Sequence, residues 1–300
     1  MPGVMSPLRR HTGRVTAFWC DDPRDVLFVT GADSLTYLQS QISQDIRNLA
    51  DGASAYTFVL QPTGKVDALA RITRRSAEVF VLDTDLGFGA ALAARLNRFK
   101  IRVKVDIAVA DASCIAVRGV AADAGAAIAG GVPAWGLESA FDVVTLAGDG
   151  DAEPPAGVRA GTSAELQLAR IEAGWPAMGD EITDATIPAE SGVVPFAVNF
   201  TKGCYPGQEL VERMDSRGSQ APRFVRRLRA VGDSLADVPA VGAELSHDGK
   251  TVGLLTSVSA TADGWVALGV VARSVHPGDM VTVGADAGSN CTATVEDTAR

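Results

Sequence analysis

Cysteine and histidine are scarce in this 300-residue sequence, which contains four cysteines and three histidines. Cys20, Cys114, Cys204 and Cys291 lie far apart, and no two of them form a CxxC pair. Zinc and iron–sulfur sites normally take clustered ligands. We therefore expect no self-contained metal site in this chain.

Long hydrophobic runs are also absent. No stretch of 18 or more apolar residues offers a transmembrane helix. Residues 1–15 contain arginines with no apolar run after them, so the sequence shows no secretory signal. These absences predict a soluble, cytoplasmic protein with reduced thiols and no membrane partner.

Positive charge is in deficit, since the formal net charge is −9. A broad nucleic-acid-binding surface needs a basic face, so we expect no stable nucleic-acid binding. One run of cations leaves two interpretations open, a local basic patch or the solvated side of a strand. That run consists of Arg223, Arg226, Arg227 and Arg229.

The remaining composition, with 47% hydrophobic and 21% charged residues, is that of a globular protein with ample chain for a core. In the first two thirds, strand and helix patterns alternate. A helix after Gly31 is expected to be capped by Asp33. Alternation over residues 101–109 predicts a strand. A capping box at Thr162 and Glu165 predicts a helix that ends near Gly174.

After Pro222 the pattern changes to short alternating strands. We therefore divide the chain into an α+β body over residues 1–221 and a β-barrel or sandwich over residues 222–300. Residues 175–200 between the last predicted helix of the body and the next motif carry three prolines and little periodicity. An irregular stretch of this length inside a compact protein is usually functional or a linker.

The next motif, over residues 200–210, combines a cation, a thiol, a phenol, an amide and a carboxylate with two glycines and a proline. Pro206 suits the first position of a helix. That helix start and Lys202 would both favour the thiolate of Cys204. The alternative is a glycine-rich turn that carries a partly buried, inert cysteine.

The string Lys202-Gly203-Cys204-Tyr205-Pro206-Gly207-Gln208-Glu209 resembles the diagnostic motif of the YgfZ family of folate-binding proteins. These are relatives of the aminomethyltransferase (T-protein) of the glycine cleavage system. Three other segments resemble the family in order and spacing, so the resemblance spans most of the chain. They are residues 29–41, the turn Pro62-Thr63-Gly64-Lys65 and residues 170–176.

The resemblance implies an α+β, T-protein-like ring of three domains. Two interleaved α+β domains, whose crossover the sequence does not place, would form residues 1–221, and a C-terminal β-barrel would form residues 222–300. It also implies tetrahydrofolate, or a derivative, as cofactor in a central opening. The family is associated with assembly or repair of iron–sulfur enzymes, including tRNA-modifying ones, so iron–sulfur client enzymes or assembly proteins are the expected partners.

Cys204 is the first candidate for the functional residue, as nucleophile, redox thiol or transient cluster ligand, at the edge of that opening. Lys202 would lower its pKa or bind an anion such as the glutamate tail of folate. Tyr205 could stack on a flat ring or act as a packing lid. The remaining motif residues are expected to support the loop: Gly203, Gly207, Gln208, Glu209, Arg213 and Arg217.

Glu172 and Glu190 are candidates for pterin recognition, because a carboxylate accepts two parallel hydrogen bonds from a 2-amino-pyrimidinone edge. For Glu172 the alternative is an exposed ion pair. Trp175 could flank the ring, and the alternative for it is a place in the core.

One departure from the resembled aminomethyltransferases concerns their Asp-Asp pair. Asp67 matches its first member and Ala68 replaces the second, which argues against orthodox aminomethyl transfer. The leading hypothesis is therefore a tetrahydrofolate-binding accessory protein that acts through Cys204 without turnover. The alternative is a folate-dependent one-carbon transferase that uses Asp67, and a third possibility is a pure scaffold.

Overall fold

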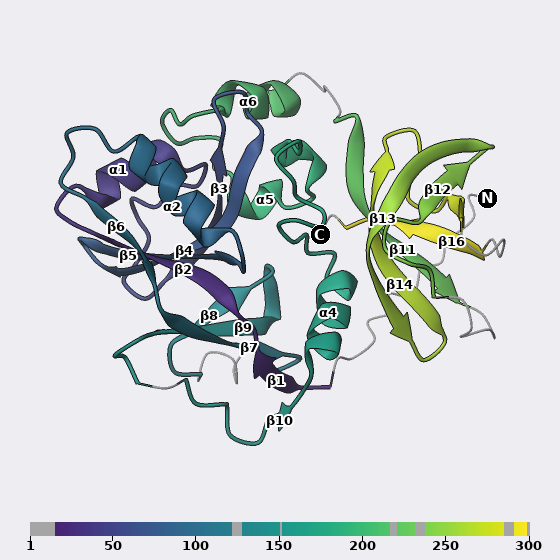
Figure 1. Cartoon of the computed structure of the whole chain (residues 1–300), viewed down its shortest axis with the longest axis horizontal. Coiled ribbons are helices and arrows are strands. Elements are labelled where there is room, and N and C mark those ends of the chain that lie inside the picture. The colour runs from purple at the N-terminus through teal and green to yellow at the C-terminus, as the bar shows by residue number, and fades with distance from the viewer. Residues whose placement is uncertain are drawn as a thin grey trace, which may run out of the picture.

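The computed structural model describes residues 16–121, 128–150, 152–216, 221–231, 238–284 and 291–298. These residues form two five-stranded sheets, a closed barrel and short helices (Figure 1). The barrel lies at one side of the molecule, and helices α1 (Ser34–Gln41) and α2 (Gly89–Arg98) lie at the opposite side. No helix in the described part of the chain is long and apolar enough to cross a membrane.

The first sheet has the strand order β3-β4-β5-β2-β6. Helices α1 and α2 pack against it, and their Leu38 and Leu96 are fully buried against Ala68 and Ile72 of one strand. Its strands are β2 (Arg24–Thr30), β3 (Ser54–Leu60), β4 (Val66–Ser76), β5 (Val79–Asp85) and β6 (Asp106–Ala110).

The second sheet has the order β10-β1-β7-β9-β8 and takes its first strand from the start of the chain. The chain leaves this sheet after Asp21, builds the whole first sheet, and returns at Ala112. The two sheets are therefore interleaved in sequence. The strands are β1 (Phe18–Asp21), β7 (Ala112–Arg118), β8 (Gly131–Ala134), β9 (Leu137–Leu146) and β10 (Arg159–Ala160).

A buried charge network joins the two sheets. Arg71 of β4 binds Asp83 of β5 and, at 2.8 Å, Asp142 of β9, which also accepts from Arg118 of β7 at 2.7 Å. Burial by itself would raise the pKa of Asp142, but the two guanidinium groups lower it to about 2. Arg118 also lies over the Trp135 ring.

The C-terminal strands form a closed barrel in the order β11-β14-β13-β12-β15-β16. Of the two alternatives that the strand pattern left open, a barrel or a sandwich, the structure shows the barrel. Its interior is apolar, with Leu228, Leu245 and Leu255 fully buried. Its strands are β11 (Arg223–Val231), β12 (Glu244–His247), β13 (Lys250–Thr261), β14 (Gly264–Ala272), β15 (Met280–Val283) and β16 (Cys291–Glu296).

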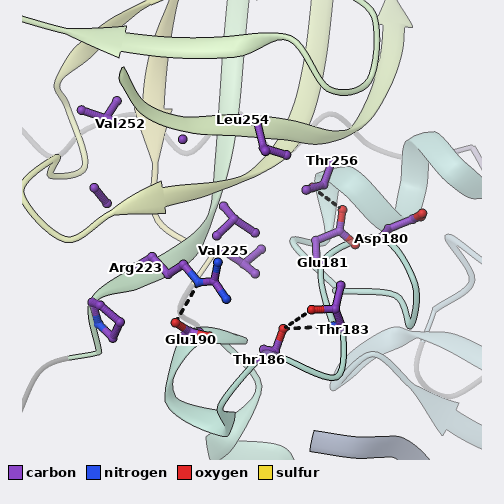
Figure 2. A pocket seen from close by; sticks show the side chains of 14 residues that line it. Asp180, Glu181, Thr183, Thr186, Glu190, Arg223, Val225, Val252, Leu254 and Thr256 are labelled. Atoms are coloured by element: carbon purple, nitrogen blue, oxygen red, sulfur yellow. Dashed lines mark hydrogen bonds and ion pairs between the residues drawn. The ribbon is translucent and has the colours of Figure 1, made fainter. Parts of the chain in front are cut away.

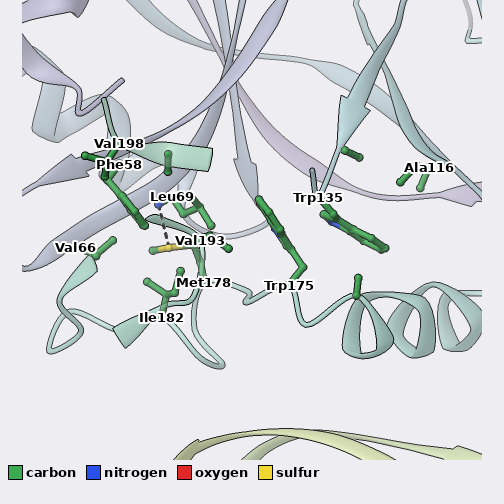
Figure 3. Packing of buried hydrophobic residues seen from close by; sticks show 14 of the residues in the cluster. Phe58, Val66, Leu69, Ala116, Trp135, Trp175, Met178, Ile182, Val193 and Val198 are labelled. Atoms are coloured by element: carbon green, nitrogen blue, oxygen red, sulfur yellow. Dashed lines mark hydrogen bonds between the residues drawn. The ribbon is translucent and has the colours of Figure 1, made fainter. Parts of the chain in front are cut away.

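Helix α4 (Ser163–Glu172) begins at the predicted capping box, in which Thr162 and Glu165 each accept the other's backbone N–H. A largely irregular segment follows, with a 3-10 turn η1 (Pro188–Glu190) and the short helix α5 (Val194–Ala197), and it leads to α6 (Gln208–Ser216). Side chains of this segment enter the core between the sheets, as Figure 3 shows for Trp175 and Met178.

Two details of the first sheet differ from the sequence prediction. The strand expected over residues 101–109 forms only as β6, because Arg102 has a left-handed backbone (φ 57°). Asp33 does not cap α1 with its side chain. Its carboxylate instead accepts the backbone N–H of Lys104 at 2.7 Å, and this bond holds the chain before β6.

Candidate functional site

The cysteine loop lies against the turn that precedes β4. Gly207 has φ +80°, and a Cβ atom there would lie 2.5 Å from the carbonyl oxygen of Gln61 and 3.0 Å from Cα of Gly64. Gly64 has φ +86°, and its Cβ would lie 2.5 Å from Cβ of Leu210. Only glycine accepts both the backbone angle and the close approach. The two motifs therefore dock on each other through a pair of glycines.

Cys204 is exposed on this loop. Gly203 before it has open space around its Cα, while Tyr205 after it is buried in the core between the sheets. Helix α6 begins at Gln208, two residues later than the position predicted for Pro206. The sequence thus placed the thiol correctly on a loop before a helix, and the structure adds that its side chain is open to solvent.

Lys202 points into the protein and holds the loop to α1. Its ammonium donates to the carbonyl oxygens of Gln39 at 2.7 Å, of Gln44 at 3.1 Å, and of Ile42. All three protons are therefore used, and burial lowers the pKa of this ammonium to about 8. We expected Lys202 to lower the pKa of the Cys204 thiol or to bind an anionic ligand. Its ammonium instead binds three backbone carbonyl oxygens, and Lys202 thereby positions the loop.

The polar residues after the cysteine act on the loop and helix themselves. The side-chain carbonyl of Gln208 accepts the N–H of Tyr205 at 3.2 Å, and Glu209 pairs with Arg213 at 2.7 Å on the helix surface. Gln208 thus bonds the backbone of the loop, whereas Glu209 bonds a residue of its own helix. Arg217 lies outside the described residues.

Glu190 lies in a different place, at a cavity of about 450 Å³ between the irregular segment and the barrel. Figure 2 shows Glu190 and Arg223 next to each other among the residues that line this cavity, joined by a salt bridge of 2.9 Å. The side chain of Glu190 is only 4% exposed, and its other oxygen accepts the backbone N–H of Ile187 at 3.1 Å.

The cavity has one polar and one apolar wall. Thr183 and Thr186 supply hydroxyl groups on the side of the irregular segment. Glu181 accepts from Arg170 and from Thr256 of the barrel, so its carboxylate is neutralised and bound. The apolar wall comes from the barrel and consists of Val225, Val252, Leu254, Val270 and Ala272.

The other residues expected at a folate site are bound elsewhere. Glu172 forms a salt bridge with Arg229 of the barrel. This is the ion pair that we considered as the alternative to pterin recognition. Trp175 is buried, and its ring centre lies 4.5 Å from that of Tyr56. It is therefore a core residue, which was the alternative to a place beside the pterin ring. The structure does not bring either residue together with Glu190 in the cavity.

Asp67 occupies a β-bulge, because β3 and β4 pair Val59 with Ala68 and Leu60 with Val66. Its carboxylate accepts from Arg95 of α2 at 3.0 Å. Ala68, 1% exposed, faces the helices. Ala68 is therefore part of the apolar core, and a second carboxylate at this position would have apolar surroundings.

Tetrahydrofolate requires an acceptor for its 2-amino-pyrimidinone edge and apolar surfaces for its ring. The cavity supplies both, because each oxygen of Glu190 keeps a second lone pair and three valines line the opposite wall. A pterin ring fits this set of residues. Cys204 does not line the cavity, although α6 contacts η1, the turn that carries Glu190.

Sequence reasoning missed Arg223, Thr183 and Thr186 as cavity residues. The irregular segment over residues 175–200, with its three prolines, indicated a functional region in the sequence. It did not indicate that the barrel forms the other wall of the cavity. The four arginines of the run over residues 223–229 form no free basic patch, because each has a carboxylate partner. The pairs are Arg223–Glu190, Arg226–Asp297, Arg227–Glu296 and Arg229–Glu172.

No family model matches the chain, but known proteins do. The chain is 26% identical to the tRNA-modifying protein YgfZ of Klebsiella pneumoniae over 288 residues, which cover 87% of the chain and 86% of that protein. An uncharacterized protein of Haemophilus influenzae is 30% identical over 194 residues, 64% of the chain and 66% of that protein.

A mitochondrial iron–sulfur cluster assembly factor IBA57 homolog of Pyricularia oryzae is 28% identical over 217 residues, 67% of the chain and 54% of that protein. Among solved structures, the glycine cleavage system aminomethyltransferase T of Bartonella henselae superposes with a TM-score of 0.77 at 21% identity, over 95% of the chain and 86% of that protein.

The superposition shows that the fold is that of the aminomethyltransferase class, α+β with a C-terminal barrel, as the sequence predicted. Within this class, the chain belongs to the YgfZ-type family.

Proposed function

We propose that the chain is a tetrahydrofolate-binding accessory factor for the assembly or repair of iron–sulfur enzymes, including tRNA-modifying ones, and that it acts through Cys204. The observation that carries the proposal is the complete cysteine loop, fixed by Lys202 and Gly207 with the thiol exposed. Two relatives support it by name, a tRNA-modifying protein and an iron–sulfur cluster assembly factor.

Cys204 would act as a contact to the client. Its S–H loses a proton to solvent, and the sulfur then binds an iron of the client's cluster. Among the described residues, no group of three His, Cys, Asp or Glu side chains could hold a metal. The remaining ligands of such a cluster would come from the client or its assembly proteins, which suits a transient contact in a cytoplasmic accessory factor.

Glu190 is the residue that we propose for pterin recognition. It would accept hydrogen bonds from the 2-amino-pyrimidinone edge while barrel valines cover the ring. When bound, the folate would supply a one-carbon carrier next to η1. We do not propose aminomethyl transfer, because Asp67 is bound to Arg95 and the aminomethyltransferase neighbour at 21% identity shows the fold alone.

Thermal unfolding with tetrahydrofolate tests the folate part. The wild-type protein is expected to be stabilised by about 3 kcal/mol at 100 times the dissociation constant. Glu190→Gln should weaken binding about 10- to 100-fold, because it replaces a charged acceptor by a neutral one. Glu172→Gln is the matched control and should bind like wild type. Absence of any shift with the wild-type protein would reject folate binding and favour a scaffold.

A further inference from the structure

The segment of residues 98–104, at the end of α2 and before β6, carries four cations in seven residues. Arg98, Lys100, Arg102 and Lys104 occupy every second position in it. Three of them are exposed and Lys100 is half-buried. In a chain with a net charge of −9, this positive charge is local, and it differs from the equally dense run over residues 223–229, whose arginines are paired with carboxylates.

These four cations are not neutralised by the described residues. None of them takes part in a side-chain hydrogen bond or ion pair there, whereas the neighbouring Arg95 binds Asp67 and Leu60. Unpaired cations gathered on one segment give a local positive potential, which attracts an anionic partner.

The segment is also held in a defined shape. The backbone of Lys104 exchanges hydrogen bonds with Asp33, at 2.7 Å to the carboxylate and 3.2 Å from the backbone N–H. Val105 is buried, and Gly31 packs so closely that a Cβ there would lie 2.1 Å from the Lys104 carbonyl oxygen. The segment that carries the cations is therefore fixed, and it joins α2 to β6 on the side of the molecule away from the barrel (Figure 1).

Two exposed apolar side chains lie between the cations. The ring of Phe99 is 36% exposed and rests on the Arg95 guanidinium, whose central carbon lies 4.0 Å from the ring centre. Ile101 is 71% exposed. An exposed aromatic ring among cations is the arrangement that binds single-stranded nucleic acid, in which bases stack on the ring and phosphates contact the cations.

We infer that residues 98–104 bind a single-stranded segment of RNA, with an unpaired base stacked on Phe99 and phosphates held by Arg98, Lys100, Arg102 and Lys104. The aromatic ring favours RNA over an acidic protein, since a carboxylate needs no stacking surface. This inference goes beyond the proposed function and uses none of the residues of the cysteine loop or the cavity. It departs from the sequence expectation of no stable nucleic-acid binding, because one local patch can bind a short strand without a broad basic face.

The test is fluorescence anisotropy of a labelled single-stranded RNA oligonucleotide with the full-length protein, between about 50 and 200 mM KCl. With four phosphates contacted, the logarithm of the binding constant should fall with a slope of about −3 against the logarithm of salt concentration. Each single change to glutamine among the four cations should make the slope about 0.7 less steep. Lys250→Gln, an exposed lysine of the barrel, should leave it unchanged.

Phe99→Ala separates RNA from an acidic partner. It should lower RNA affinity about 5- to 150-fold with little change in the salt slope, because it removes stacking and no charge. Thermal unfolding of each variant verifies that it is folded. The inference is overturned if wild-type protein does not bind the RNA, if the fourfold glutamine variant binds as tightly, or if a polyglutamate peptide binds equally well and Phe99→Ala has no effect.

Discussion

Gly64 and Gly207 pack backbone against backbone, so that a Cβ atom on Gly207 would lie 3.0 Å from the Cα of Gly64. The two residues are far apart in the sequence and belong to the two turns that most clearly resemble the family. Their contact fixes the cysteine loop on the end of the first sheet. The position of the Cys204 thiol is therefore determined by the fold and not by the loop alone.

Gly207→Ala is expected to destabilise the protein by about 3 kcal/mol, because the new methyl group meets the Gln61 carbonyl and the left-handed backbone is strained. Urea denaturation measures the effect. Gly203→Ala, in the same loop, is the matched control, since nothing lies within 4 Å of its added Cβ. It should change the free energy of unfolding by less than about 0.5 kcal/mol. Equal effects of the two changes would refute the docking account.

Lys202→Met tests whether this lysine holds the loop. The change leaves the buried carbonyl oxygens of Gln39, Ile42 and Gln44 without their donor, and we expect a loss of about 3 kcal/mol in the free energy of unfolding. Lys250→Met, on the barrel surface, should cost less than about 0.5 kcal/mol. A Lys202→Met protein as stable as wild type would show that the ammonium does not position the loop.

The buried carboxylate of Asp142 makes the free energy of unfolding depend on pH in the acid range. Its pKa is about 2 in the folded protein and about 3.9 in an unfolded chain. Since the folded pKa is the lower one, its contribution of about 2–3 kcal/mol is present above pH 4 and is lost as the pH falls towards 2. Denaturation midpoints between pH 2 and 5 should show this slope.

Asp142→Asn should cost about 3–5 kcal/mol at pH 7, because Arg118 stays buried without its carboxylate and Arg71 keeps only Asp83, and it should flatten that acid slope. Asp149→Asn breaks the exposed pair with Arg75 and should cost less than about 1 kcal/mol. If the two variants lost similar free energies of unfolding, the charge network between the sheets would not behave as a buried network.

The sequence predicted most of the architecture because local patterns determine it. The capping box at Thr162 and the alternation after Pro222 each specify an element without reference to distant residues. The strand expected over residues 101–109 forms only in part, as β6, because Arg102 has a left-handed backbone and Asp33, far away in sequence, binds the Lys104 backbone. Tertiary contacts of this kind leave no periodic signal.

The site was predictable only in part, for the same reason. The place of Cys204 on a loop before a helix and the support from Gln208 were predictable, whereas the exposure of the thiol comes from the structure. The three carbonyl partners of Lys202 and the salt bridge of Glu190 with Arg223 depend on how separate segments pack. Residue type alone could not distinguish a lysine that activates a thiol from one that holds a helix end.

The most direct measurement of the central claim is iron–sulfur enzyme activity in a strain that lacks this protein, complemented with Cys204→Ser. The account predicts that this variant accumulates as a folded protein but leaves activity at the level of the deletion strain. Cys291→Ser, which changes a half-buried cysteine of the barrel, should restore activity like the wild-type protein. Full restoration by Cys204→Ser would contradict a function that depends on the exposed thiol.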